Sequence, residues 1–241
     1  MDLERYLSQI SIKEIFPEGQ RKIADTTVLV VGLGGTGSVM SELLVRMGIK
    51  KIILVDDDTV ELSNLNRQSL YSENDVGELK VEAARRHLIS INEHLEIEMI
   101  PERLDIDNGE NIIKKSDIVL DGTDNYTSRG IINADCIKLE TPWIFSAVEG
   151  TSGYVKAIIP RVTACLSCMN YPEEGEAVPC TVAGVLPSAV HSIGALASSI
   201  AIKTILGKES GNLYFFDVWK PLLESVSIER NKSCKTCGDG N

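Results

Sequence analysis

The stretch Thr27–Gly37 reads TVLVVGLGGTG and decides the fold of this chain. Its first part, Thr27–Val31, is a short run of β-branched and apolar residues, which is typical of a strand buried on both faces. A glycine-rich turn follows at once. The next residues, Ser38–Met47, carry apolar side chains at helical spacing and end at Gly48, a favourable helix C-cap. A second apolar run, Lys51–Val55, comes next, so the sequence predicts a βαβ unit.

The glycines of this turn predict a nucleotide site. Gly32 permits a tight turn, Gly34 allows close approach of a ligand, and Gly37 lets the helix pack closely on the strand. Gly35 lies in the same turn, where the N–H groups and the dipole of the helix N-terminus favour phosphate. Asp56, about twenty residues farther on, is placed to accept hydrogen bonds from a ribose. A glycine turn that serves packing alone is the alternative interpretation.

Strands and helices alternate along most of the remaining chain. After Asp56 the pattern predicts helices at 78–92, 111–116, 128–139 and 183–206, and strands at 96–100, 117–120, 142–147, 153–159, 213–217 and 223–228. This alternation indicates an α/β fold with a Rossmann-like, mostly parallel sheet flanked by helices. We expect residues 1–160 to form N-terminal helices and a nucleotide-binding core. Residues 161–241 should form a zinc-knuckle and partner-binding extension packed on that core.

Two CxxC pairs lie far apart in the sequence. Cys165 and Cys168 form the first, and Cys234 and Cys237 form the second. Each pair has the spacing with which two thiolates bind one tetrahedral Zn²⁺. Such a site has no open coordination position, so we predict a structural zinc that holds the end of the chain against its middle.

Charged residues follow two of the predicted strands. Arg67 and Lys80 lie beyond Asp56, near the sheet edge where ligands of open α/β sheets bind, and could clamp a triphosphate. Asp124 follows the strand at 117–120 within DGTDN, and a carboxylate there could hold Mg²⁺ against phosphates. The alternatives are ordinary surface solvation for the two cations, and a turn with a helix N-cap for the DGTDN segment.

Bulk properties exclude several classes of protein. The formal net charge is −11, which disfavours extended nucleic-acid binding because that function needs many cations. No secretory signal is visible at the N-terminus. The apolar stretch 183–206 contains Pro187, His191 and Lys203, and we interpret it as a buried helix and not as a membrane span. We therefore expect a cytoplasmic protein that binds neither nucleic acid nor membrane.

Taken together, these residues resemble the MoeB/ThiF/HesA family, bacterial relatives of the ubiquitin-activating enzymes. The resemblance covers nearly the whole chain, in the family's order and spacing. It rests on GLGGTGS (Gly32–Ser38), VDDDTVELSNLNRQ (Val55–Gln68), VGELKVE (Val76–Glu82), DGTDN (Asp121–Asn125), CLSC (Cys165–Cys168), PCTVAGVLP (Pro179–Pro187) and CKTC (Cys234–Cys237).

The resemblance implies an adenylyltransferase that uses ATP and Mg²⁺ and acts as a homodimer. Its substrate would be a ubiquitin-like sulfur-carrier protein with a C-terminal Gly-Gly, whose carboxylate becomes an acyl adenylate on the way to a thiocarboxylate. Asp56 would bind ribose and Asp124 would hold Mg²⁺. The side chains that would contact phosphates are those of Asn64, Arg67, Gln68 and Lys80.

Two positions qualify this expectation. Cys180 stands where ThiF-type members carry a cysteine able to link covalently to the activated partner, and its structural alternative is a small buried hydrophobe. Members of the family often begin with Arg-Tyr-x-Arg-Gln, whose second arginine reaches the phosphates of a neighbouring subunit. Ser8 occupies that position here, and Arg5 or Arg21 would have to replace the missing charge.

Two other functions remain open from the sequence. The βαβ unit would also suit an NAD(P)-dependent oxidoreductase, although Arg67, Lys80 and DGTDN have no evident use in one. A non-catalytic, zinc-stabilised interaction module is the third hypothesis, and Ser8 favours it slightly. Nothing in the sequence selects among thiamine, molybdopterin, tRNA-thiolation and specialised pathways, or identifies the sulfur donor.

Overall fold

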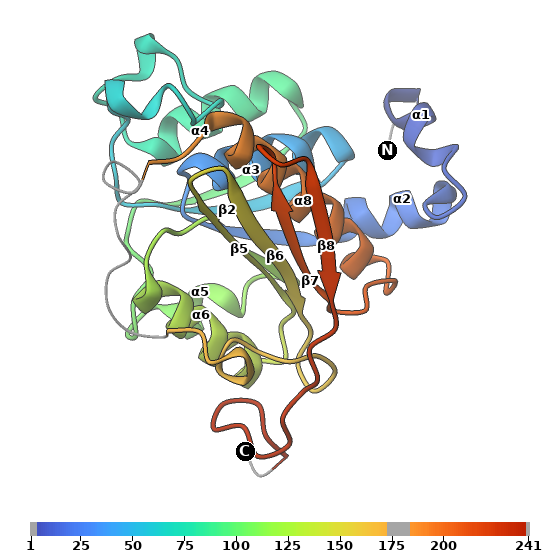
Figure 1. Ribbon diagram of the computed structural model, residues 1–241. Coiled ribbons are helices and arrows are strands. Elements are labelled where there is room, and N and C mark those ends of the chain that lie inside the picture. Colours follow the sequence, from blue (N-terminus) through green and yellow to red (C-terminus); the bar gives the residue numbers. More distant parts are fainter. Residues whose placement is uncertain (1–3, 173–183, 240–241) are drawn as a thin grey trace.

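The computed structural model describes residues 4–172 and 184–239, and these residues build one eight-stranded sheet (Figure 1). The spatial order of its strands is β3-β2-β1-β4-β5-β6-β7-β8. The strands are β1 (Thr27–Val31), β2 (Lys51–Val55), β3 (Glu96–Ile100), β4 (Ile118–Asp121), β5 (Trp143–Glu149), β6 (Ser152–Ile158), β7 (Leu213–Asp217) and β8 (Leu222–Val226). Strands β7 and β8 come from the predicted extension and continue the sheet of the predicted core. The division at residue 160 stays a prediction.

The pairing of the strands changes from parallel to antiparallel at β5. Strands β1 to β5 pair in parallel, and Val31 lies level with Val55 and Asp121, so three strands end at one edge. Strands β5 and β6 form an antiparallel hairpin, and the pairing stays antiparallel through β8. The turn of the hairpin contains Gly150 at φ +60°, a conformation that glycine adopts without strain. The predicted Rossmann-like sheet is confirmed, and its antiparallel half is an addition that the sequence analysis did not distinguish.

Helices cover both faces of the parallel half. Val28 and Val30 point to one face of β1 and Leu29 and Val31 to the other, and each set joins a separate buried cluster. This alternation is what a strand buried on both sides requires. The helices on the first face are α3 (Gly35–Met47), α4 (Lys80–Ile91) and α8 (Pro187–Ile205), and those on the second are α5 (Gly109–Ile113) and α6 (Tyr126–Lys138).

Helix α8 is the apolar helix that the sequence analysis places at 183–206. Among the described residues it is the one helix that is long and apolar enough to cross a membrane, judged by length and composition. Of its apolar window, 50% is buried within the protein. Gly194 lies so close to α3 that an added Cβ would stand 2.8 Å from the side chain of Val39. This packing agrees with the predicted core helix.

The N-terminal segment forms an arm at the right of Figure 1. It consists of a short 3₁₀ helix (Glu4–Tyr6), α1 (Leu7–Ile10) and α2 (Phe16–Asp25). Arg5 donates a hydrogen bond of 2.7 Å to the carbonyl of Ile91 at the end of α4. Arg5, Ser8 and Arg21 are exposed, and none of them lines the cavity described below.

Candidate active site

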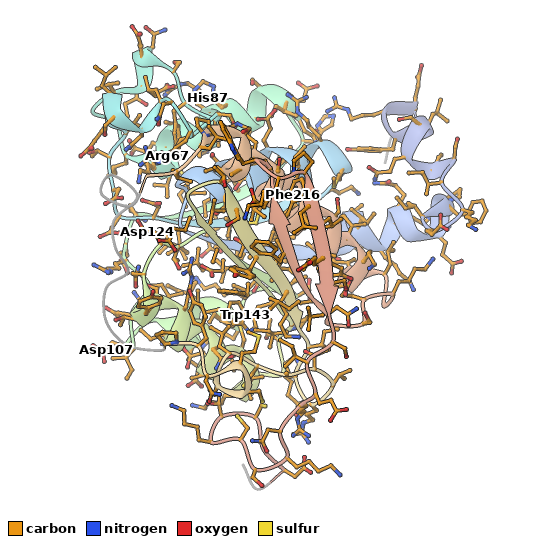
Figure 2. All side chains as sticks on the ribbon, viewed as in Figure 1. Arg67, His87, Asp107, Asp124, Trp143 and Phe216 are labelled. Atoms are coloured by element: carbon orange, nitrogen blue, oxygen red, sulfur yellow. The ribbon has the colours of Figure 1, made fainter. Side chains whose placement is uncertain are left out.

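A cavity of about 760 Å³ opens at the carboxyl ends of β1, β2 and β4. This is the edge at which open α/β sheets bind ligands. Arg67 and Asp124 lie on the same side of the molecule, in its upper left part in Figure 2. The predicted residues that line this one cavity are Gly32, Gly34, Gly35, Asp56, Asn64, Arg67, Gln68, Lys80 and Asp124.

The glycine turn is shaped by contacts between backbones. Gly32 has φ +83°, and its N–H donates to the carbonyl of Val55 at 2.8 Å. A Cβ on Gly37 would stand 1.9 Å from the carbonyl oxygen of Gly32, whereas a Cβ on Gly34 would meet nothing closer than 3.8 Å. A Cβ on Gly35 would stand 2.7 Å from Val190 on α8. Gly37 is therefore needed for packing, and Gly34 leaves space open on the cavity side.

The paired substitutions Gly37→Ala and Gly34→Ala should separate these roles. Gly37→Ala forces a methyl group against a backbone oxygen, so we expect a loss of more than about 3 kcal/mol in the free energy of unfolding. Gly34→Ala should change stability by less than about 1 kcal/mol yet weaken nucleotide binding, because the methyl group would occupy the space that the predicted nucleotide site leaves for phosphates. Urea unfolding and calorimetric titration with ATP measure the two effects. Equal stability losses in both variants would contradict this division.

Asp56 holds the glycine turn in place. Its Oδ2 accepts the N–H of Leu33 at 2.6 Å, and its Oδ1 accepts the N–H of Asp58 at 2.9 Å. Burial raises the pKa of Asp56 above its ordinary value, although Lys80 and the two N–H groups act in the opposite direction. The carboxylate at the end of β2 therefore has a structural task in addition to any contact with a ligand.

Lys80, the first residue of α4, lies between two carboxylates. Its Nζ is 2.7 Å from Oδ2 of Asp58 and 3.8 Å from Oδ1 of Asp56, and its side chain is only 7% exposed. The Asp58 side chain is 66% exposed. A lysine can be buried at this place because the two carboxylates compensate its charge. The sequence predicted the place of Lys80 but not its pairing with Asp58.

Arg67 and Gln68 stand on the segment between β2 and α4. Nη1 of Arg67 donates to the Ser63 carbonyl at 2.9 Å and to Oδ1 of Asn66 at 3.1 Å. Oδ1 of Asn64 accepts the N–H of Glu61 at 3.1 Å, which closes a short 3₁₀ turn. Oε1 of Gln68 is buried and has no hydrogen-bond partner within residues 4–172 and 184–239. A buried amide without a partner is costly, and a polar ligand in the cavity would satisfy it.

Asp75 links the segment between β2 and α4 to helix α4 itself. It accepts hydrogen bonds from N–H and Oγ of Ser72 at 2.6 and 2.8 Å, contacts Nε2 of His87 at 2.9 Å and pairs with Arg86. Burial alone would raise the pKa of Asp75, but the bonds from Ser72, His87 and Arg86 outweigh burial and hold it well below its ordinary value.

Asp75→Asn should lower stability in a pH-dependent way. Because the folded pKa lies below the unfolded one, the ionised carboxylate stabilises the fold above the unfolded value of about 3.9 and loses this effect as pH falls. We expect a loss of about 1–3 kcal/mol in the free energy of unfolding at pH 7 and a smaller one at pH 3. Urea unfolding at both values measures it, with Glu73→Gln as an exposed control from the same turn. A loss independent of pH would refute the assignment.

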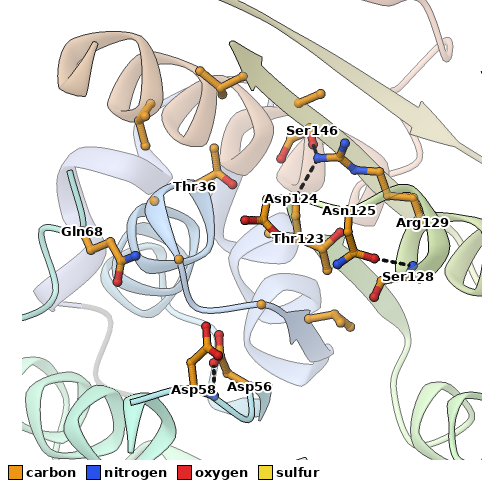
Figure 3. A pocket seen from close by; sticks show the side chains of 18 of the residues that line it. Thr36, Asp56, Asp58, Gln68, Thr123, Asp124, Asn125, Ser128, Arg129 and Ser146 are labelled. Atoms are coloured by element: carbon orange, nitrogen blue, oxygen red, sulfur yellow. Dashed lines mark hydrogen bonds between the residues drawn. The ribbon is translucent and has the colours of Figure 1, made fainter. Parts of the chain in front are cut away.

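The DGTDN loop contains residues with a structural role, as in a turn with a helix N-cap, and also a carboxylate that is available to bind a cation. Oδ2 of Asp121 is 3.0 Å from Nε of the buried Arg129. Oδ1 of Asn125 caps α6 by accepting the N–H of Ser128 at 2.8 Å (Figure 3). These two residues are structural. The Asp124 carboxylate is exposed, and within the described part of the chain it forms neither a hydrogen bond nor an ion pair. It is therefore available to a cation in the cavity.

The four predicted zinc ligands form one cluster. The Sγ atoms of Cys165 and Cys234 are 3.7 Å apart, those of Cys168 and Cys237 are 3.5 Å apart, and those of Cys165 and Cys168 are 3.9 Å apart. Disulfide bonds are far shorter. Four thiolates around tetrahedral Zn²⁺, with Zn–S near 2.3 Å, have sulfur–sulfur distances of about 3.8 Å. The donor set fits a structural zinc. Cys180 lies outside the described residues.

Comparisons with known proteins place this geometry in a family. The model of the ThiF family matches residues 6–236. The chain is 34% identical to the sulfur carrier protein ThiS adenylyltransferase of Escherichia coli over 243 residues, which cover 100% of this chain and 97% of that protein. It is 35% identical to the molybdopterin-synthase adenylyltransferase of Salmonella typhimurium, with 98% and 97% covered. The SAMP-activating enzyme E1 of Haloferax volcanii is 32% identical, with 99% and 90% covered.

Solved structures share the fold. The E. coli MccB structure with MccA-N7isoASN superposes with a TM-score of 0.85 at 23% sequence identity and covers 99% of this chain and 75% of its own. At this identity the likeness concerns the fold alone. The family match, by contrast, spans nearly the whole sequence and includes the glycine turn, the residues that line the cavity and three of the four clustered cysteines, with Cys237 just beyond its end. The chain therefore belongs to the ThiF family.

Proposed function

We propose that this chain catalyses the ATP-dependent adenylation of the C-terminal glycine carboxylate of a ubiquitin-like sulfur-carrier protein, with release of pyrophosphate. The observation that carries the proposal is the cavity that unites the glycine turn at the N-terminus of α3 with Lys80, Arg67 and the exposed Asp124. The relatives named sulfur carrier protein ThiS adenylyltransferase and molybdopterin-synthase adenylyltransferase support the same reaction.

The chemistry demands little of the protein beyond orientation and charge. A carboxylate oxygen of the partner attacks the α-phosphorus of ATP, the bond to the bridging oxygen breaks, and that oxygen leaves with pyrophosphate. No proton has to move, because the nucleophile is already ionised. In this proposal Lys80 and Arg67 neutralise charge on the phosphates, Asn64 and Gln68 contact them, and Asp56 binds the ribose.

Two metals belong to the proposal. Mg²⁺ would bind Asp124 together with phosphate oxygens, which is how this ion commonly binds. Zn²⁺ would occupy the cluster of four cysteines. We also propose a cytoplasmic homodimer. Sedimentation should then give twice the 26.3 kDa of one chain.

The test is intact-mass spectrometry of a small ubiquitin-fold carrier ending in Gly-Gly, incubated with the enzyme, ATP and Mg²⁺. We expect the carrier to gain one adenylyl group and to lose it on hydrolysis. A carrier that lacks its last glycine is the control and should stay unmodified. Covalent attachment of the carrier to the enzyme, lost in Cys180→Ser, would support a covalent role for that cysteine.

The oxidoreductase hypothesis makes the opposite prediction. Binding of NADH without ATP–pyrophosphate exchange would favour it, and binding of ATP without exchange would favour the interaction module. The proposed adenylation requires exchange that depends on the carrier.

A further inference from the structure

Arg129 is a buried arginine to which the sequence analysis gave no role. It lies on α6 directly beneath the DGTDN loop, with only 5% of its surface exposed. Nε donates to Asp121 at 3.0 Å, and Nη2 donates to the carbonyls of Thr123 at 2.6 Å and Ser146 at 3.0 Å. One guanidinium therefore ties the end of β4, the loop after it and strand β5 together.

The fourth partner of this guanidinium comes from a different region. Nη1 of Arg129 donates to the hydroxyl of Tyr171 at 2.7 Å. The guanidinium carbon also stands 5.5 Å from the ring centre of Phe145 and 5.9 Å from that of Tyr171, and the two rings meet edge to face at 5.0 Å. Tyr171 thus contributes both a hydrogen-bond acceptor and an aromatic face to the burial of the charge.

Tyr171 is itself anchored to the first cysteine pair. Its backbone N–H donates to the carbonyl of Leu166 at 3.2 Å, and Leu166 lies between Cys165 and Cys168. The N–H of Leu166 is held in turn by Oδ1 of Asn133 on α6 at 3.1 Å. A short chain of contacts therefore leads from the cysteine cluster through Tyr171 to Arg129.

At its other end this series of contacts fixes the backbone next to Asp124. The carbonyl that Arg129 holds belongs to Thr123, so it is part of the peptide unit that leads into Asp124. The N–H and hydroxyl of Thr123 are bound to Asp121 at 2.9 and 2.6 Å. On the far side, Asn125 is fixed as the cap of α6. The exposed carboxylate of Asp124 thus stands on a backbone that is held on both sides (Figure 3).

We propose that Tyr171 is a positioning residue, which orients Arg129 and through it the backbone at Asp124. The first cysteine pair and the part of the cavity around Asp124 would then be structurally coupled. This inference rests on the proposed function, in which Asp124 holds Mg²⁺. Tyr171 lines the same cavity. In this role it acts through Arg129 and not by contact with metal or nucleotide, so its effect should appear only in the part of nucleotide affinity that depends on Mg²⁺.

The decisive variant is Tyr171→Phe, which keeps the ring and removes the acceptor. One N–H of a buried guanidinium then loses its partner, and the guanidinium must shift to regain one. We expect the ratio of ATP dissociation constants without and with Mg²⁺ to fall about tenfold, as a change near 1.4 kcal/mol would produce. Affinity in the presence of EDTA should stay unchanged.

Calorimetric titration with a non-hydrolysable ATP analogue, with Mg²⁺ and with EDTA, measures this ratio. The proteins are the wild type, Tyr171→Phe, Asp124→Ala and the double variant, with thermal melts to confirm folding. Tyr214→Phe is the matched control, because it also removes a bonded hydroxyl but lies on β7 outside the cavity. In the double variant, Tyr171→Phe should add nothing to Asp124→Ala, since both act on one magnesium site.

The outcomes separate this inference from the proposed function. A wild type that binds the analogue equally with and without Mg²⁺ would overturn the role of Asp124, and the positioning role with it. A magnesium-dependent wild type whose ratio is unchanged in Tyr171→Phe would overturn the positioning role alone. Equal losses with Mg²⁺ and with EDTA, or additive losses in the double variant, would show general destabilisation and would also overturn it.

Discussion

Asp124→Ala should lower carrier-dependent ATP–pyrophosphate exchange by about 100- to 1000-fold, while the protein stays folded. The carboxylate is exposed and forms no ion pair among the described residues, so its removal leaves no buried group without a partner. Asp124 is the one protein carboxylate to which the proposed function assigns Mg²⁺ binding, and the variant lacks it. Exchange of labelled pyrophosphate into ATP, measured over a range of Mg²⁺ concentrations, gives the size of the effect.

The controls for this prediction come from the same chain. Asp107→Ala removes an exposed carboxylate that lies well away from Asp124 in Figure 2 and does not line the cavity. It should exchange at the wild-type rate. Asp124→Asn keeps the shape but not the charge, so it should require more Mg²⁺ for half-maximal exchange. Full activity of Asp124→Ala at ordinary Mg²⁺ would remove this residue from the mechanism.

Cys234→Ser should remove the metal and unfold the C-terminal knuckle. Structural zinc sites contribute about 10–16 kcal/mol of apparent binding free energy, so losing one of four thiolates should cost several kcal/mol of stability. We expect about one zinc per chain in the wild type and a clear loss in the variant, together with a lower Tm. Metal analysis and thermal unfolding measure both quantities.

Cys136→Ala separates the loss of a metal ligand from the loss of a buried cysteine. Cys136 is fully buried on α6 and is not part of the cluster. Its variant should lose some stability through a small cavity but keep its zinc. Cys234→Ser protein with a full zinc content and an unchanged Tm would refute the structural zinc.

The backbone of the parallel half could be predicted closely, because its signals are local. Thr27–Val31 and Lys51–Val55 are strands with the predicted bounds, since each is a short, mainly apolar run closed by a glycine or a polar residue. Glu96–Ile100 also has the predicted bounds, and there glutamates alternate with apolar residues before Pro101 ends the strand. The left-handed cap at Gly48, with φ +103°, follows from the one residue type that adopts it easily. The residues of the cavity were found for a related reason, because parallel strands end at a common edge.

Side-chain partners that lie far apart in sequence could not be predicted. The spacing of Lys80 indicates a place near the nucleotide, but its pairing with Asp58 depends on how the intervening segment folds back. Arg129 sits in an ordinary helical pattern, and only the tertiary fold brings Asp121, Ser146 and Tyr171 around it. The pairing direction of β6 to β8 was not predicted, because direction is set by the connections between strands and not by composition.

The ion pair at Lys80 has a consequence for which anions can enter the site. A phosphate that reaches Nζ must take the place of Asp58, so binding there is an exchange of one oxyanion for another and yields little net Coulomb energy. Asp58 is already largely hydrated, and its release into water costs little. In the proposed function a small anion such as free sulfate would occupy one of these positions at a time, whereas a polyphosphate would reach Lys80, the N-terminus of α3 and Arg67 together. The paired lysine should therefore make the site selective for polyphosphates over single small anions.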